Sequence, residues 1–195
     1  ASLVHDTAHY GDSLILGGCD VTLLEMLEGY MTLATLGIRK TPALLRGNPA
    51  PASSPTSQKQ RVFSEGAAFL VADILRDTGR LLPIFREVFR YEERSIAFKT
   101  GTSYGLRDAW AAAYTPSWSA VVWVGDTAAA SHPDLVGLHA AAPAALKIIR
   151  HLSQGRGDWY DPPDSVSRGE VCSLSGMPPS PLCPRTKTEW RVTDV

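Results

Sequence analysis

The strongest constraint on the fold is a change of hydrophobic period in the middle of the chain. Between residues 95 and 124, short runs rich in β-branched, aromatic and alanine residues alternate with turn residues. The runs cover 95–98, 109–114 and 120–124, and the turns lie at 101–105 and 115–117. Short runs joined by short links predict three sequential strands that form an antiparallel meander.

Helical patterns lie on both sides of this block. Residues 20–37 contain a capping box, in which Thr22 is followed by Glu25, and Gly37 supplies the stop. Ser64 can cap a second helix that runs to Asp77. Residues 138–152 return to helical spacing after the strands, and we expect this helix to cover the sheet.

Two further segments complete this outline of the fold. A shorter helical piece is predicted at 83–89, and the segment 41–60 has the Pro- and Ser-rich composition of an exposed connector. The predicted fold class is α+β, with an antiparallel sheet flanked by helices.

Charge and composition exclude several classes of function. The 195 residues include 19 basic and 20 acidic side chains, so a nucleic-acid partner is not predicted. No run of 18 apolar residues is present, so we expect no membrane segment in this chain. The three cysteines and five histidines have no metal-finger spacing. No metal and no other cofactor is predicted.

The C-terminal part of the chain differs in composition from the rest. Residues 154–170 are rich in Pro, Gly and Asp and are interpreted as a linker, and 171–195 are too few for an independent core. Cys172 and Cys183 can close a small loop as a disulfide in an oxidising compartment. The alternative is two reduced cysteines that pack as small hydrophobic residues. Cys19 is interpreted as a small core residue.

The residues most informative about chemistry are Lys99-Thr100-Gly101-Thr102-Ser103, at the end of the first predicted strand. A phosphate-binding loop would need glycine before the lysine, where Phe98 stands. The same letters match the K-T-G element of serine acyl-transfer enzymes that act on β-lactams and D-alanyl peptides. The alternative is a solvated lysine at a strand end, followed by an ordinary turn.

In a site of that kind, the strand lies alongside an extended substrate peptide. Gly101 permits the close approach, and Lys99 places a positive charge near a substrate carboxylate and the nucleophile. Thr100 and Thr102 offer hydroxyl groups, and the Thr102 backbone N–H offers one arm of an oxyanion hole. Lys99 and Thr102 are the predicted catalytic residues. The predicted substrate-binding residues are Thr100, Gly101, Thr102, Ser103 and Tyr104.

Two neighbouring features receive structural interpretations. Arg107 and Asp108 are interpreted as a local ion pair that fixes the strand end. Trp110, Trp118 and Trp123 are interpreted as aromatic residues that pack on the sheet.

The residues around the K-T-G element extend the match. The stretch KTGTSYGLRDAWAAAYTPSWSAVVWVG with the helix APAALKIIRHL, and the earlier GDSLILGGCDVTLLEMLEGYMTLATLG, resemble the transpeptidase domain of class A penicillin-binding proteins. This resemblance covers residues 8–153. The tail VCSLSGMPPSPLCPRTKTEW resembles the beginning of the C-terminal domain of 1C-type members of that family. The domains implied are residues 1–153 as transpeptidase, 154–170 as linker and 171–195 as the start of that further domain.

The resemblance implies a bacterial serine D,D-transpeptidase of cell-wall synthesis, bifunctional with a glycosyltransferase in the complete protein. Its partners would be D-Ala-D-Ala stem peptides and β-lactams, on the periplasmic face of the inner membrane, with the anchor outside this chain. No serine here is followed by lysine three residues later, and the only asparagine, Asn48, is not in an S-x-N element. We therefore expect the nucleophile to lie upstream of Ala1 and this chain alone to be inactive.

Several alternatives remain open from the sequence. The chain can be a portion of a longer enzyme, or it can belong to a lineage that has lost catalysis. The function can also be that of a D,D-carboxypeptidase or β-lactamase, or of a noncatalytic wall-binding or assembly module. Because the family sheet has five strands, we expect an unpaired sheet edge that supports self-association or binds a retained partner chain.

Overall fold

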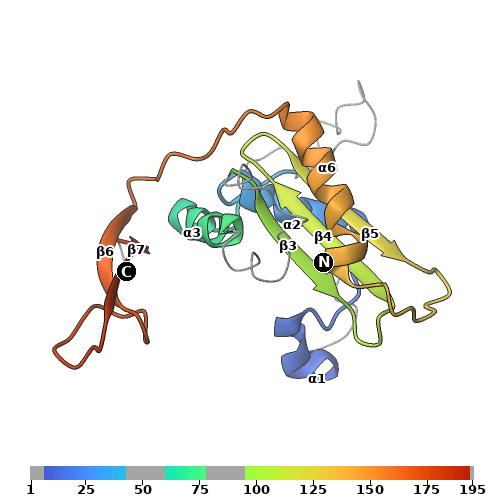
Figure 1. The fold of residues 1–195 in the computed structure, drawn as a ribbon, viewed down its shortest axis with the longest axis horizontal. Coiled ribbons are helices and arrows are strands. Elements are labelled where there is room, and N and C mark those ends of the chain that lie inside the picture. The colour runs from blue at the N-terminus through green and yellow to red at the C-terminus, as the bar shows by residue number, and fades with distance from the viewer. Residues whose placement is uncertain (1–6, 43–59, 78–94, 194–195) are drawn as a thin grey trace.

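A three-stranded antiparallel sheet forms the centre of the molecule (Figure 1). The computed structural model describes residues 7–42, 60–77 and 95–193. The strands are β3 (Ala97–Thr102), β4 (Asp108–Tyr114) and β5 (Ser119–Gly125), in the spatial order β3-β4-β5. The predicted meander is confirmed. Within the described residues, the outer edges of β3 and β5 are unpaired.

The first strand differs from its predicted extent. It was predicted at 95–98 with a turn from 101, but β3 continues to Thr102. The ladder explains the difference, because Gly101 pairs with Trp110 and Thr102 pairs with Ala109. The β-branched Thr100 and Thr102 favour extended backbone on either side of the glycine. The K-T-G residues therefore lie in the strand itself.

Two helices cover one face of the sheet. They are α5 (Gly137–Ala140) and α6 (Ala142–Ser153), and Pro143 lies in the first turn of α6. Alternate residues of the strands form a core with these helices, and this core includes Phe98, Ala109, Ala111, Ala113, Leu138, Ala145, Leu146 and Ile149. Figure 1 shows α6 lying across the sheet.

Two other helices pack against the opposite face. α2 (Leu23–Ala34) begins with the predicted capping box, in which the Glu25 carboxylate accepts from the Thr22 N–H at 2.9 Å. α3 (Glu65–Arg76) begins at Ser64, whose hydroxyl accepts from the Ala67 N–H at 3.2 Å. A core between these helices and the sheet contains Ala34, Ala72, Ala97 and Tyr114.

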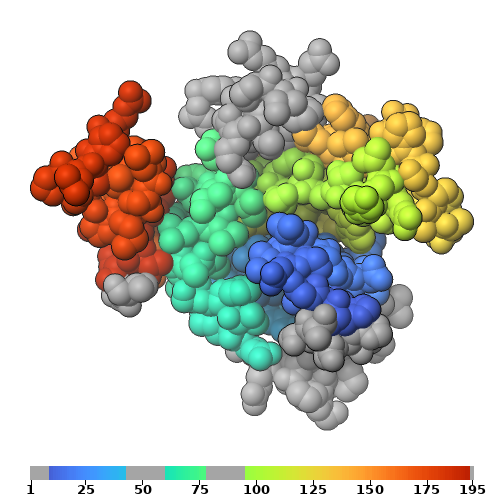
Figure 2. Space-filling model, turned by 90° about the horizontal axis from the view of Figure 1, so that it is seen from below, coloured from blue at the N-terminus to red at the C-terminus, as the bar shows by residue number. Residues whose placement is uncertain are grey.

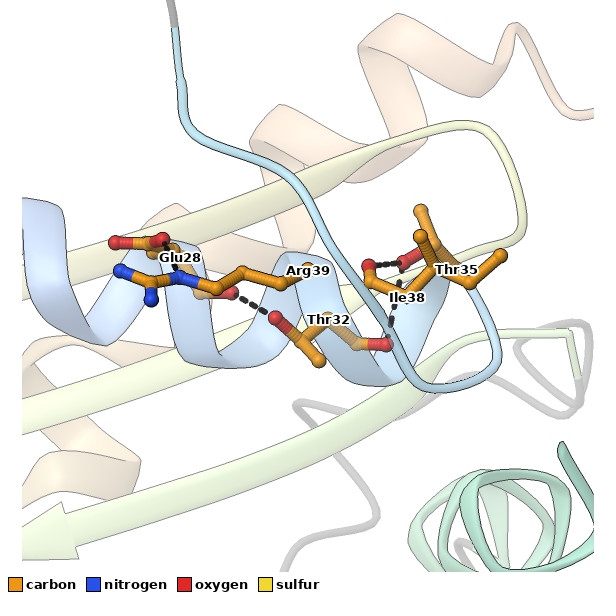
Figure 3. A network of polar contacts seen from close by, with 5 residues as sticks. All are labelled: Glu28, Thr32, Thr35, Ile38 and Arg39. Carbon is orange, nitrogen blue, oxygen red and sulfur yellow. Dashed lines mark hydrogen bonds and ion pairs between the residues drawn. The ribbon is translucent and has the colours of Figure 1, made fainter. Parts of the chain in front are cut away.

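A polar network and a turn at Gly37 connect α2 to β1 (Ile38–Arg39). β1 pairs with β2 (Gln60–Arg61). Figure 3 shows the Thr35 hydroxyl bonded to Ile38 O, and Arg39 paired with Glu28 across the turn. Gly37 has a φ of 90°, and a Cβ there would lie 2.2 Å from Phe63 O. Only glycine fits this turn, as the predicted helix stop requires.

The C-terminal hairpin packs against α3. Its strands are β6 (Val166–Cys172) and β7 (Thr186–Val192), so the last residues of the predicted linker 154–170 are strand. Trp190 packs edge-on against Phe69, with 5.5 Å between ring centroids. The Arg168 guanidinium lies 4.8 Å from the Trp190 ring centroid on the same hairpin. Figures 1 and 2 show the hairpin beside α3.

The N-terminal residues add a short helical segment. α1 (Thr7–Tyr10) is followed by the 3-10 helix η1 (Gly11–Leu16), which ends at Gly17 with a φ of 88°. The predicted helical piece at 83–89 and nearly all of the predicted connector 41–60 lie outside the described residues.

The fully buried Leu146 provides a test of the α6 interface. It has no exposed surface, whereas Ile148 on the same helix is 42% exposed. Leu146→Ala should lower the free energy of unfolding by about 2–5 kcal/mol because it leaves a cavity in the core. Ile148→Ala should cost much less. Urea unfolding of both variants measures the difference, and equal losses would contradict this packing.

Candidate functional site

A cavity of about 900 Å³ lies on the α2 face of the sheet. Residues 15–21 form one wall, together with Leu23, Met26 and Tyr30 from α2. Strand residues form the other wall, and these are Lys99, Thr100, Gly101, Thr102, Ser103, Asp108, Trp110, Ala111, Ala112, Val121 and Trp123. The cavity therefore brings together four of the five predicted substrate-binding residues and both predicted catalytic residues.

The outer edge of β3 presents main-chain groups beside this cavity that take no part in the ladder with β4. The Ser103 N–H donates to Asp108 O at 3.0 Å, which makes 103 and 108 a hydrogen-bonded pair. Hydrogen-bonded and non-hydrogen-bonded pairs alternate along an antiparallel ladder. Thr102 opposite Ala109 and Thr100 opposite Ala111 are therefore non-hydrogen-bonded pairs. The N–H and C=O groups of Thr100 and Thr102 point away from β4, toward the open edge.

Lys99 places its charge at the same edge. Its side chain is exposed and lines the cavity, and its ammonium donates to Thr100 O, one of the carbonyls directed outward. An incoming anion or carbonyl at this edge would meet a cation and an unpaired N–H together. This arrangement can stabilise negative charge that develops on a substrate oxygen.

The two hydroxyl groups that follow Gly101 are already engaged. Thr102 Oγ1 accepts from the Gly137 N–H at 2.9 Å. Ser103 Oγ accepts from the N–H groups of Asp108 at 2.8 Å and Arg107 at 3.3 Å, so it fixes the turn after β3. Each hydroxyl keeps its own proton for donation.

Tyr104 lies apart from the other predicted residues. It is 100% exposed at the tip of the turn and does not line the cavity. The structure gives it no contact with the site, so its predicted role in substrate binding has no support from the geometry.

The sequence interpretation missed part of the cavity wall. Trp110 and Trp123 line the cavity, with 6.4 Å between their ring centroids, and are not only packing residues. The carboxylate of Asp108 accepts from Trp123 Nε1 at 2.9 Å. Asp108 thus orients a wall residue, a role different from the ion pair with Arg107 that was predicted. The alternation Asp108, Trp110, Ala112 along β4 is the signal that places these side chains on one face.

The three cysteines occupy two separate regions. Cys19, predicted in the core, is half-buried in the cavity wall. Cys172 and Cys183 are free thiols here, in contrast to the disulfide that the sequence allows. Hydrogen bonds from the backbone at Ser175 and Leu174, and then from the Cys183 side chain, lower the pKa of Cys172 to about 7.

This lowered pKa predicts the pH at which Cys172 ionises. In the reduced protein, the ultraviolet absorbance of the thiolate should rise with pH through about 7, and Cys172→Ser should lack this rise. Cys183→Ala removes the side-chain hydrogen bond and should raise the midpoint. Absorbance during a pH titration measures the midpoint without access of a reagent to Cys172, which is only 5% exposed. A midpoint at the usual thiol pKa would contradict the predicted effect.

Comparisons with known proteins extend these geometric findings. The family described as the penicillin binding protein transpeptidase domain matches residues 3–150. Penicillin-binding protein 1C of Escherichia coli is 32% identical over 167 residues, which are 85% of this chain and 20% of that protein. Penicillin-binding protein 1A of Clostridium tetani is 30% identical over 130 residues, which are 64% of this chain and 16% of that protein.

The fold has a counterpart among solved structures. The 2.6 Å crystal structure of penicillin-binding protein 1A from Haemophilus influenzae matches with a TM-score of 0.72 and 20% identity. The match covers 94% of this chain and 34% of that chain. The antiparallel sheet with its flanking helices is therefore the fold of that structure's corresponding part.

The chain belongs to the penicillin-binding protein transpeptidase family. It spans between 16% and 21% of the length of the curated relatives it matches. In the part of the chain that the structure describes, no helix has the length and apolar character needed to cross a bilayer.

Proposed function

We propose that this chain supplies the K-T-G strand of a serine D,D-transpeptidase that cross-links peptidoglycan. The observation that carries the proposal is the open edge of β3, where outward main-chain groups of Thr100 and Thr102 lie beside Lys99 at a cavity. A stem peptide ending in D-Ala-D-Ala is extended and can pair with such an edge as an added strand. Its terminal carboxylate carries the charge that Lys99 attracts.

The proposed reaction has two acyl-transfer steps. A serine hydroxyl attacks the carbonyl of the penultimate D-Ala, an ester forms, and the terminal D-Ala leaves with the proton on its amine. An amine of a neighbouring stem peptide then attacks the ester, forms the cross-linking amide and gives one of its own protons to the departing serine oxygen. The Thr102 N–H would stabilise the oxyanion in both steps. The serine would lie upstream of Ala1, so we propose that this chain alone does not react.

The remaining parts of the proposal concern the complete protein. We propose that it acts on the periplasmic face of the bacterial inner membrane, is acylated by β-lactams, and carries a glycosyltransferase domain. A carboxypeptidase or β-lactamase would use water in the second step. A noncatalytic module would form no acyl-enzyme at all.

Acylation of the complete protein by a fluorescent penicillin tests the role of Lys99. Lys99→Ala should lower the acylation rate by about 10²-fold or more, because the positive charge beside the substrate carboxylate and the nucleophile is lost. The exposed Lys147→Ala on α6 is the matched control and should react as the wild type does. A wild-type protein that forms no adduct would favour the noncatalytic module, and a fully active Lys99→Ala would remove Lys99 from the site.

We also propose that the outer edge of β5 pairs with another strand, in this isolated chain by self-association. The ladder leaves the N–H groups of Val121 and Trp123 directed outward, since Ala111 and Ala113 direct theirs toward β5. Val121→Pro removes one outward N–H without removing a ladder bond. Sedimentation of this chain should show a dimer that Val121→Pro weakens. A monomer at high concentration would contradict self-association.

A further inference from the structure

Gly137 touches the K-T-G strand from the face opposite the cavity. It is buried at the start of α5, and a Cβ atom at this position would lie 2.2 Å from Gly101 O and 2.7 Å from Trp110 O. Both of these atoms belong to backbone that is held in the β3–β4 ladder. No side chain can therefore fit at 137 unless α5 or the strands move.

A hydrogen bond also ties Gly137 to the residue after Gly101. The Gly137 N–H donates to Thr102 Oγ1 at 2.9 Å. The first N–H groups of a helix have no partner within the helix, and Val136 provides no side-chain cap to α5. The Thr102 hydroxyl takes the place of that cap. Because Gly137 has no side chain, its backbone can lie close to Gly101, and its N–H bonds to the Thr102 hydroxyl.

The helical backing makes this contact stiff. Leu138, Ala141 and Ala142 lie within five residues after Gly137, and all three are buried in the core against the sheet. If α5 were pushed outward, these residues would leave their packed positions. A displacement at 137 is therefore transmitted in part to β3.

We propose that Gly137 is a positioning residue that sets where the backbone N–H of Thr102 lies at the open edge of β3. The effect of Gly137 on catalysis rests on the proposed transpeptidase function. The structural part of the proposal, that Gly137 holds the 99–103 backbone in place, does not depend on any reaction.

The size of the effect follows from the contact distance. A Cβ at 137 needs about 1 Å more room to reach ordinary van der Waals separation from Gly101 O. A misplacement of about 1 Å at a reacting centre can lower a rate by about 10²-fold. Because the strain is shared between α5 and β3, we expect a fall of about 10- to 100-fold in the acylation step.

The test compares three Gly→Ala variants in the complete protein. Gly137→Ala is the variant of interest. In Gly66→Ala a new Cβ would meet Ser165 Oγ at 2.9 Å and Val166 Cγ1 at 3.1 Å, at the interface of α3 with the hairpin. Gly29→Ala on the exposed surface of α2 meets nothing within 4 Å. The set separates loss of position at β3 from general loss of stability.

Two measurements are made on each variant. Hydrogen–deuterium exchange of residues 99–103 reports the strand, and stopped-flow binding of a fluorescent penicillin separates noncovalent affinity from the acylation rate constant. For Gly137→Ala we expect faster exchange at 99–103 and a lower rate constant with nearly unchanged affinity. Gly66→Ala should lower the melting temperature and leave both measurements on the folded protein unchanged.

Each outcome decides the inference. If Gly137→Ala behaves as Gly29→Ala does in exchange and acylation, the inference is wrong. If the wild type forms no adduct, the proposed function fails, and exchange at 99–103 still decides the role of Gly137. If Gly137→Ala does not fold, Thr102→Val replaces it, because it removes the acceptor of the Gly137 N–H. Thr102→Ser is its control, because it keeps the hydroxyl. Faster exchange at Gly137 and 99–103 in Thr102→Val than in Thr102→Ser would support the inference, and equal exchange in the two variants would overturn it.

Discussion

The alternation of side chains along β4 is the constraint on which the rest of the structure depends. Ala109, Ala111 and Ala113 are almost completely buried on one face, and their small side chains let the helices after β5 approach the sheet closely. The same close approach allows Gly137 to reach the backbone of Gly101. Larger residues on this face of β4 would move the helices outward and break that contact.

The opposite face of β4 is closed at one end and open at the other. Tyr114 is fully buried beside Tyr30 and Leu75, and the Tyr160 O–H donates to Ala34 O at 2.8 Å. Burial raises the pKa of both Tyr114 and Tyr160, so these phenols stay neutral. At the other end, Trp110 borders the cavity with Lys99 and Asp108. The charged side chains of Lys99 and Asp108 thus lie at the open end of this face.

The C-terminal hairpin adds a second attachment to this arrangement. Besides the contact between Phe69 and Trp190, the position of Gly66 beside Val166 leaves no spare room between α3 and β6. The C-terminal hairpin is therefore packed on a helix of the transpeptidase-family part. Through α3, it is joined to the layer that covers the closed end of the sheet.

The sequence by itself determined the elements whose signals are local. The capping residues Thr22 and Ser64, the stop at Gly37 and the period-2 runs each depend on neighbours within a few residues, so the helices and the meander could be predicted. The K-T-G match likewise predicted Lys99 and Thr102 as site residues, and both line the cavity. Only the tertiary structure decided which residues join them across the chain. The ladder register turned the main chain of Thr100 and Thr102 outward and placed Trp110 and Trp123 in the cavity wall. The packing of α5 brought Gly137 to Gly101, 36 positions earlier in the chain, and no local pattern encodes a contact between two backbones that far apart.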